Sequence, residues 1–473
     1  MVVTTRPLAE VEDRPGEVAP RRRALVRVLS SAVIVLPVAV LMLCVADWVV
    51  AVIRPATRDQ IWLWYTATHF AGVTRVQAVL LLTVAITLVL SARRVLPMAC
   101  EAALVLELGA YFFLTKIWPP TGDQATWLAN SATPDVSLSE PLADVAHKIP
   151  YWMFGDLDAV RFVAPVFGVA AVCIGLLLAR RFEHVFGIPR WVFQAALVAS
   201  PLPFWYVTGY IENTFLAVPF LLLGVWFATV PTARRGPRGP IVAAAGAFAV
   251  AGLFHAGFVL MCAALGAWIL LRSNRSARQK AIDLASAAGG ALLTAGVLVG
   301  SIALLPVRLA PGNSQGGYDG QLLVPFGPRA GDPMFRFVFV SHAHLIEFSN
   351  IVVHALPVVV LAMPVLVGVA WRRRTLRRAL LLDRRGPERD ALVLISAMAS
   401  VYLVFAASWG FDLGPVGDLD LMLTMDVGLV LAVSVLAWRL VGHRPLVLGL
   451  LLAGSGGVQF AFYAMKIADV WVT

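Results

Sequence analysis

Apolar segments alternate with short polar segments along almost the whole chain after residue 24. Each apolar run is about 20 residues long, the length that a helix needs to cross the hydrocarbon core of a bilayer. We therefore predict an all-α fold, a polytopic transmembrane helical bundle of about 13 spans with short amphipathic helices in its external loops. The expected spans are 25–53, 75–92, 95–117, 160–180, 190–208, 214–230, 240–254, 256–271, 281–305, 345–370, 391–408, 420–438 and 446–465.

The composition supports the membrane class. Of the 473 residues, 59% are hydrophobic and only 14% are charged, whereas charged residues make up about a quarter of a soluble protein. The cysteines form no CxxC pair and all fall in apolar runs, which indicates neither a disulfide framework nor a zinc site. They are Cys44, Cys100, Cys173 and Cys262.

The distribution of positive charge predicts the orientation. The net charge is +10, and the basic clusters recur at alternate ends of the spans, as the positive-inside rule expects of cytoplasmic segments. Such clusters face anionic membrane lipids, and nucleic acid is excluded as a partner. We expect residues 1–24 to be a disordered cytoplasmic tail and 25–473 to be one transmembrane domain of the plasma (inner) membrane. Its active face would be external and would carry the long loops 118–159 and 306–344.

The loop 118–159 holds the most candidate chemistry. Asp123 follows a Pro-Pro-Thr-Gly turn and precedes Trp127 on an amphipathic piece, so it suits a general base whose pKa is raised by aromatic cover. A carboxylate at this position would equally serve as a helix cap. A second helix is expected to start at Ser139-Glu140-Pro141, with His147 on the same face as Glu140. This pair is either part of a site or part of the loop structure.

A second polar segment, Tyr210-Ile211-Glu212-Asn213, lies between two expected spans. So short a turn keeps Glu212 at the membrane edge, where ionisable groups are usually functional, although a snorkelling side chain would also explain it. We expect Glu212 to act in catalysis, and Tyr210 and Asn213 to bind substrate, in a cavity shared with the other external segments.

A polar stripe enters the expected span 345–370. It consists of His344, Glu347, Asn350 and His354. These spacings place the stripe on one helical face, which is expected to line a protein cavity instead of contacting lipid. His255 is expected to break the long apolar run 241–271 and to join this cavity. A divalent metal is conceivable from such residues, but no spacing as tight as HExxH indicates a metal site.

The segment 408–420 is an acidic turn. Asp412 and Asp418 flank a Gly-Pro dipeptide that brings the acids close together. They would either coordinate a cation or bind sugar hydroxyls, or form a simple solvated turn.

These motifs together resemble the GT-C class of polytopic membrane glycosyltransferases, and most closely its uncharacterised bacterial members. The resemblance is carried by Gly122-Asp123-x-x-x-Trp127-Leu128, Ser139-Glu140-Pro141-Leu142 with His147, and Tyr210-Ile211-Glu212-Asn213. It implies an enzyme that moves a sugar from a polyprenyl-phosphate donor to a lipid or glycan acceptor of the cell envelope. It also implies that the catalytic acid lies in an early external loop.

The chain departs from this class in two respects. Many members carry an Asp-Asp or Asp-Glu pair, whereas Gln124 follows Asp123, and their acid often lies in the first external loop, where this chain offers Asp59. Either Asp59 or Asp123 is the base, and we prefer Asp123 because its loop is longer. The leaving phosphate needs a cation, and the external candidates are Arg58, Lys148, Arg308, Arg329 and Arg336. The alternatives are a transporter or lipid flippase that uses the outer-face acids as ion or headgroup sites, and a non-catalytic assembly protein.

Overall fold

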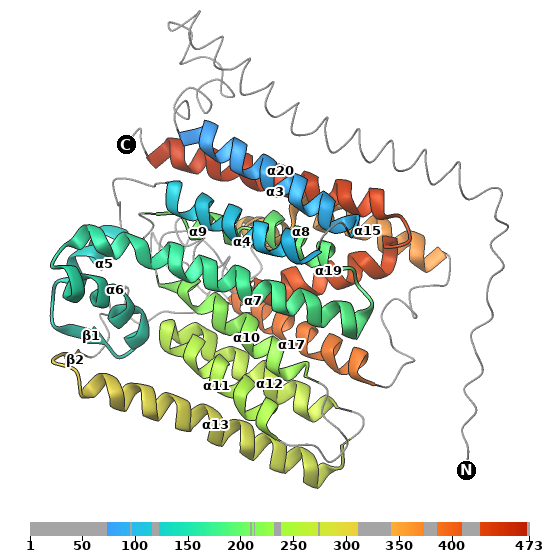
Figure 1. Cartoon of the computed structure of the whole chain (residues 1–473). Coiled ribbons are helices and arrows are strands. Elements are labelled where there is room, and N and C mark those ends of the chain that lie inside the picture. The colour runs from blue at the N-terminus through green and yellow to red at the C-terminus, as the bar shows by residue number, and fades with distance from the viewer. Residues whose placement is uncertain are drawn as a thin grey trace, which may run out of the picture. The chain divides into compact units, whose positions relative to one another are not determined.

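The computed structural model describes most of the chain after the first expected span. The described residues are 73–94, 97–115, 123–208, 211, 213–230, 238–272, 275–310, 342–372, 386–408 and 426–470. They belong to one compact unit, His69–Thr473, and are mostly helical, with long helices that run side by side (Figure 1). The expected span 25–53 and the expected tail 1–24 lie outside them.

The helices follow the expected spans closely. In chain order they are α3 Val73–Ala92, α4 Pro97–Leu114, α5 Asp123–Ser131, α6 Pro141–Phe154, the 3₁₀ helix η2 Leu157–Phe162, α7 Val163–Phe186, α8 Arg190–Ala199, α9 Leu202–Trp205, η3 Thr214–Ala217, α10 Val218–Ala228, α11 Gly239–Phe254, η4 Ala256–Val259, α12 Leu260–Leu271, α13 Ala277–Ala303, α14 His342–Ala355, α15 Pro357–Arg372, α17 Pro387–Ser408, α19 Val427–Val441 and α20 Pro445–Val470.

Three apolar runs are broken into two helices. The run 241–271 breaks at His255, as predicted, because His255 adopts an extended backbone conformation between α11 and η4. Within the expected span 190–208, α8 ends at Ala199, two residues before Pro201. Within the expected span 345–370, the helix is interrupted between α14 and α15, just before Pro357. Proline has no N–H to donate to the preceding turn, so it ends or restarts a helix at these places.

The apolar helices indicate a membrane protein. Within the described residues, four helical segments are long and apolar enough to cross a membrane. They are Pro97–Leu114, Leu157–Phe186, Ala277–Ala303 and Pro387–Ser408. Seven shorter apolar helices accompany them in the same part of the chain, so the described helices support a polytopic bundle without establishing the expected count of 13 crossings.

The fold departs from all-α at one place. Strand β1, Asp135–Ser137, pairs in parallel with β2, Arg308–Ala310, in a two-stranded sheet. Arg308 Nε also lies 2.9 Å from Asp135 Oδ1. Val136 of β1 is fully buried in a small cluster with Val145 and Ile302. This pairing joins the two segments that the sequence marks as long external loops, 118–159 and 306–344, and Figure 1 shows it beside α6 at one end of α13.

The segment 118–159 folds into helices where the sequence places them. The amphipathic piece is α5, and the second helix begins as α6 directly after Glu140. Pro141 occupies the first position of α6, where its fixed φ suits a helix start. Gly155 ends α6 with a φ of 67°, a left-handed conformation that glycine adopts without a Cβ clash.

Candidate functional site

Glu140 is the centre of a polar cluster built from three distant segments. Its Oε2 accepts a hydrogen bond from Asn213 Nδ2, and its Oε1 lies 3.2 Å from His255 Nε2. Glu140 precedes α6, Asn213 precedes η3, and His255 lies at the break between α11 and η4. The sequence marks Asn213 as a substrate-binding residue, and Glu140 and His255 as further candidates for the site, and the structure brings the three together.

The break at His255 fixes the imidazole toward Glu140. His255 Nδ1 accepts a hydrogen bond from the Gly257 N–H at 3.2 Å and thereby caps the 3₁₀ turn that starts α12. An imidazole nitrogen that accepts from an amide carries no proton, so in the neutral ring the proton is on Nε2, which faces Glu140. His255 therefore donates to the carboxylate, and its role is to hold Glu140 in place.

The turn that carries Asn213 is tied to the end of α4. The Thr208 N–H and hydroxyl both donate to the Phe112 carbonyl, each at 2.8 Å, and the Tyr206 hydroxyl donates to the Phe215 carbonyl at 2.9 Å. Gly168 of α7 permits this packing, because a Cβ there would lie 2.5 Å from Tyr206 Cβ. Asn213 is 1% exposed, so the amide that contacts Glu140 has a fixed position.

The buried face of α6 carries a second polar group that consists of Asp144, His147 and Lys148. Asp144 Oδ2 accepts from the Ser137 N–H at 2.6 Å, which ties strand β1 to the helix. Lys148 Nζ donates to the Asn130 carbonyl of α5. His147 and Lys148 are 2% and 0% exposed. This group holds α5, β1 and α6 together beneath the surface.

Burial shifts the pKa of each of these three groups. Burial raises the pKa of Asp144 to about 6, although the Ser137 hydrogen bond and the Lys148 charge oppose the rise. Burial and the Lys148 charge lower the pKa of His147 to about 3, so this imidazole is neutral near pH 7. Burial also lowers the pKa of Lys148, against the attraction of Asp144 and Asp135.

His147 does not join the cluster at Glu140. Its ring centroid lies 6.3 Å from that of Trp127 on α5, with the planes tilted by 52°, and its Nδ1 has no hydrogen-bond partner in the described part of the chain. The seven-residue spacing that suggested a shared face with Glu140 places the two residues on one helix but in different surroundings. His147 therefore belongs to the packing between α5 and α6.

The other predicted residues divide into two sets. Asp123 is the first residue of α5, and the stripe residues His344, Glu347 and Asn350 lie on α14, but their side chains are outside the described part of the structure. The predicted residues that lie wholly outside the described part are Asp59, Tyr210, Glu212, Asp412 and Asp418.

His354, the last member of the stripe, has a described partner. Its Nδ1 lies 3.2 Å from Gln459 Oε1 on α20, and Gln459 Nε2 donates to the His354 carbonyl. The Ser455 hydroxyl accepts from the Val358 N–H at 3.0 Å at the start of α15. These contacts join the break between α14 and α15 to α20, which is a structural role.

Two of the cations considered for a leaving phosphate are engaged within the protein. Lys148 is buried against α5, and Arg308 pairs with Asp135 beside the sheet. The other three, Arg58, Arg329 and Arg336, lie outside the described residues. The two described cations are therefore held by protein partners.

Sequence reasoning missed two buried polar residues, Asp426 and Tyr402. Asp426 precedes α19 and is 0% exposed, and neither carboxyl oxygen has a hydrogen-bond partner in the described part. The buried hydroxyl of Tyr402 on α17 likewise has none there. Asp426 falls inside the expected span 420–438, but nothing in its spacing marks it as buried.

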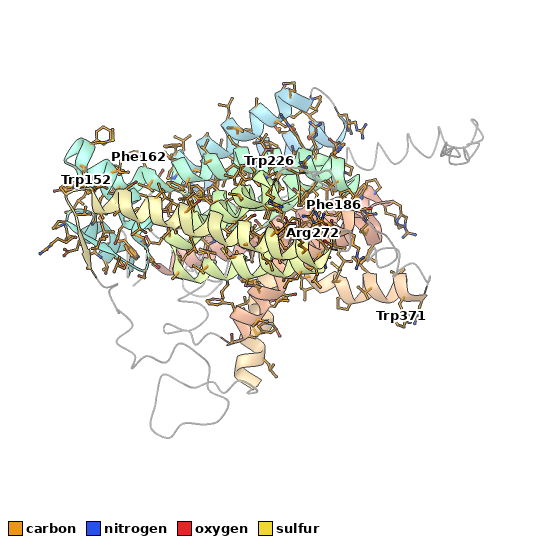
Figure 2. All side chains as sticks on the ribbon, turned by 90° about the horizontal axis from the view of Figure 1, so that it is seen from below. Trp152, Phe162, Phe186, Trp226, Arg272 and Trp371 are labelled. Carbon is orange, nitrogen blue, oxygen red and sulfur yellow. The ribbon has the colours of Figure 1, made fainter. Side chains whose placement is uncertain are left out.

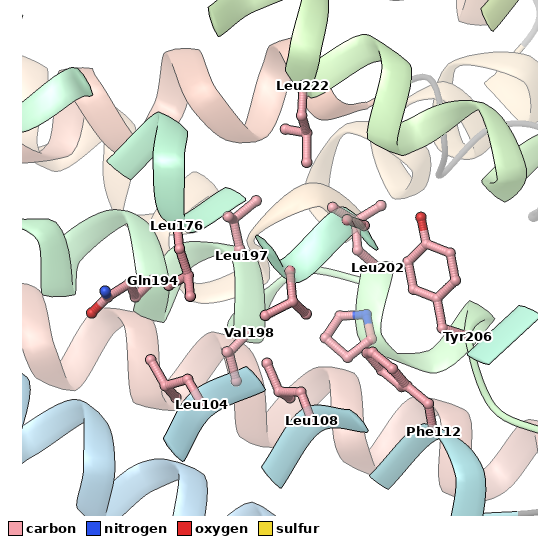
Figure 3. Close-up of a pocket in the computed structure, with 13 residues that line it drawn as sticks. Leu104, Leu108, Phe112, Leu176, Gln194, Leu197, Val198, Leu202, Tyr206 and Leu222 are labelled. Carbon is pink, nitrogen blue, oxygen red and sulfur yellow. The ribbon is translucent and has the colours of Figure 1, made fainter. Parts of the chain in front are cut away.

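The described residues form no group of three or more His, Cys, Asp or Glu side chains that could hold a metal ion. A small, partly open pocket lies among α4, α7, α8, α9 and α10 (Figure 3). Its lining is almost wholly aliphatic and aromatic, apart from Gln194 near one end and Tyr206 near the other. Such a lining offers packing for an apolar group and no acid–base chemistry.

The arrangement at Glu140 suits proton transfer or hydroxyl binding. A carboxylate that is oriented by an amide and an imidazole can accept further hydrogen bonds from a substrate hydroxyl, and it can take the proton of that hydroxyl. Its side chain is 14% exposed and that of His255 is 19% exposed, so a small polar group can approach the pair. Compared with known proteins, the chain matches no protein-family model, no curated protein and no solved structure, so its function is inferred from this geometry.

Proposed function

We propose that the protein is a membrane glycosyltransferase of the GT-C class, which moves a sugar from a polyprenyl-phosphate donor to a lipid or glycan acceptor of the cell envelope. The observation that carries this proposal is the cluster of Glu140, Asn213 and His255. A carboxylate oriented by Asn213 and His255 beside helices that are long and apolar enough to cross a membrane suits a general base that works on a lipid-linked substrate. We assign the cluster to the outer face of the plasma membrane, on the positive-inside pattern of the sequence.

In this proposal Glu140 takes the proton of the acceptor hydroxyl. The hydroxyl oxygen forms a bond to the anomeric carbon of the sugar, and the bond from that carbon to the lipid phosphate breaks. The phosphate leaves with the bonding electron pair, and a cation stabilises its charge. Lys148 is buried against α5, whereas the Arg308 side chain is 75% exposed, so the cation is assigned to Arg308, Arg58, Arg329 or Arg336. Asp123 and Glu212 stay in the proposal as further acids of the same face.

The test is sugar transfer by the purified full chain in nanodiscs, with polyprenyl-phosphate sugars as donors. Glu140→Gln keeps the shape of the side chain and removes its ability to take a proton. General-base catalysis contributes about 10²–10⁴-fold, so turnover should fall by that factor. Asp158→Asn is the matched control, because this carboxylate lies in the same segment with 64% of its side chain exposed, and it should leave turnover unchanged.

Two outcomes would contradict the assignment in different ways. Full activity of Glu140→Gln would remove Glu140 from catalysis, and Asp123→Asn would then be measured in the same assay. An absence of transfer by the unmodified protein with every donor would contradict the glycosyltransferase itself.

A polytopic transporter or lipid flippase is the second candidate function, and Asp426 is the observation that favours it. Its carboxyl is fully buried without a hydrogen-bond partner in the described part, and ionisable groups inside membrane proteins commonly mark ion or proton paths. If the protein is a transporter, movement of lipid or ion across liposomes should depend on Asp426 and be lost in Asp426→Asn. Transport that is unaffected by this change would contradict the role of Asp426.

A further inference from the structure

The last turn of helix α6 exposes large apolar side chains, although several polar residues of the same helix are buried. Its polar residues Asp144, His147 and Lys148 are buried, whereas Trp152 and Phe154 near its end are exposed, at 42% and 69%. A helix on the surface of a soluble unit shows the opposite pattern, with its apolar face toward the core. The exposed end of α6 therefore needs an apolar neighbour.

This exposed end is part of a larger apolar patch. We name it the apolar rim, and it consists of Phe113, Trp152, Met153, Phe154 and Phe162, all of them exposed. Phe113 at the end of α4 stacks on Phe162 of η2, with ring centroids 6.1 Å apart and planes within 25°. Figure 2 shows Trp152 and Phe162 projecting from the same end of the described unit. Clustered exposed apolar side chains of this kind mark a binding surface.

The apolar rim is continuous with the outer surface of two membrane-crossing helices. On α4, Leu106 and Leu114 are 72% and 63% exposed, and on α7 Val166 is 56% exposed. Both helices belong to segments that are long and apolar enough to span a membrane. The rim lies where α4 ends and where η2 leads into α7, so it extends the exposed apolar surface of these helices.

A polar border limits the rim on the far side. Asp156 and Asp158 directly follow the exposed end of α6 and are themselves exposed, and Asp158 pairs with Arg161 at 2.5 Å. Aromatic side chains beside charged ones are typical of the membrane–water interface, where Trp and neighbouring apolar residues insert and carboxylates stay in water.

We propose that the apolar rim is inserted into the bilayer and that phospholipid is its partner. The last turn of α6 then lies in the headgroup region, while its first turn keeps Glu140 against Asn213 and His255. Insertion of the apolar rim thus fixes the depth of α6 in the bilayer. This inference concerns the surface alone and holds whether the protein transfers sugars or moves lipids.

The test places a photoreactive benzoyl-phenylalanine at single positions of the full chain in nanodiscs of a defined phospholipid. The probe at position 154, or at position 162 if the first variant fails to fold, is expected to yield protein with one added phospholipid mass after illumination. Position 106 on α4 is the positive control for lipid contact. Position 158, in the polar border, is the matched control and is expected to give little lipid adduct.

The outcomes separate the partners. Lipid adducts at 154 and 162 with a yield comparable to that at 106 would support the proposal. A crosslinked dimer at 154 and 162 would show that a second copy of the chain covers the rim, and would overturn it. Equally low lipid yields at 154, 162 and 158 would show that the rim lies in water, and would also overturn it.

Discussion

Asp144 and His147 should make opposite contributions to the pH dependence of the segment that contains α5, β1 and α6. The pKa of Asp144 is raised from 3.8 to about 6. Its contribution to the free energy of opening this segment is therefore complete below pH 3.8 and is lost as the pH rises to about 6. The pKa of His147 is lowered from 6.5 to about 3, so its contribution is complete above pH 6.5 and is lost as the pH falls to about 3.

Between pH 4 and pH 6 the two effects nearly cancel. In the closed segment the proton is on Asp144 and His147 is neutral, whereas in the opened segment His147 carries the proton and Asp144 is ionised. Both forms bind about one proton, so the free energy of opening should change little with pH. Each residue alone would give a slope of up to about 1.4 kcal/mol per pH unit, and a total of about 2 kcal/mol over this range.

Single substitutions should reveal the pH dependence that each residue gives to the free energy of opening. In His147→Gln the opposing titration of the imidazole is absent, so the free energy of opening should fall by up to about 1.4 kcal/mol per pH unit between pH 4 and pH 6. In Asp144→Asn only His147 titrates, so the same quantity should rise at the same rate. The slopes are independent of any constant loss of stability that a substitution causes, and Glu140, which also acts on Asp144, is present in all three proteins.

Hydrogen exchange followed by mass spectrometry measures this quantity. The protection factors of peptides from α6, corrected for the intrinsic pH dependence of exchange, should change by up to about tenfold per pH unit in each variant and in opposite directions. Peptides from α7 are the internal control and should show no such slope. Flat protection in both variants, or slopes of the same sign, would refute the reasoning.

Two further changes test the packing around the site. Gly168→Val should destabilise the protein by about 1–3 kcal/mol, because its Cβ would lie 2.5 Å from Tyr206 Cβ. A thermal melt in detergent measures this loss, and an unchanged melting midpoint would contradict the close approach. Asp135→Asn should lower the stability of the sheet by less than about 1 kcal/mol, because the ion pair of Asp135 with Arg308 is mostly exposed. Hydrogen exchange in 135–137 measures this loss. Complete loss of protection there would show that the ion pair, and not the strand pairing, holds the sheet.

Much of the helical framework could be predicted from the sequence, because apolar runs and proline positions act locally. The break at His255 followed from length alone, since the run 241–271 exceeds one crossing. The start of α6 followed from Glu140-Pro141, where proline favours the first helical position. The division of the span 345–370 before Pro357 was missed, although the same property of proline explains it.

The sequence identified the residues of the site, but it did not predict that they lie next to one another. Glu140 stood out in a polar loop, Asn213 in a short polar turn and His255 inside an apolar run, but only the packing of α6, η3 and α11 makes them neighbours. The burial of Asp144 and Lys148 was not predicted, because polar residues on a short helix normally face water. Spacing offers no signal for this burial, because Trp152 lies four residues after Lys148 and Phe154 seven after His147, on the same side of the helix.

The parallel pairing of β1 with β2 has a consequence for biogenesis. The partner of Val136 is Leu309, so α5 and α6 are synthesised long before the strand that anchors them. At about 5–20 residues per second the ribosome needs on the order of 10–30 s to add the intervening chain. During this time Asn213, then His255, and finally β2 arrive in sequence, so Glu140 acquires its neighbours one at a time. Assembly of this end of the protein is therefore a late step, which requires the synthesis of α13 to be complete.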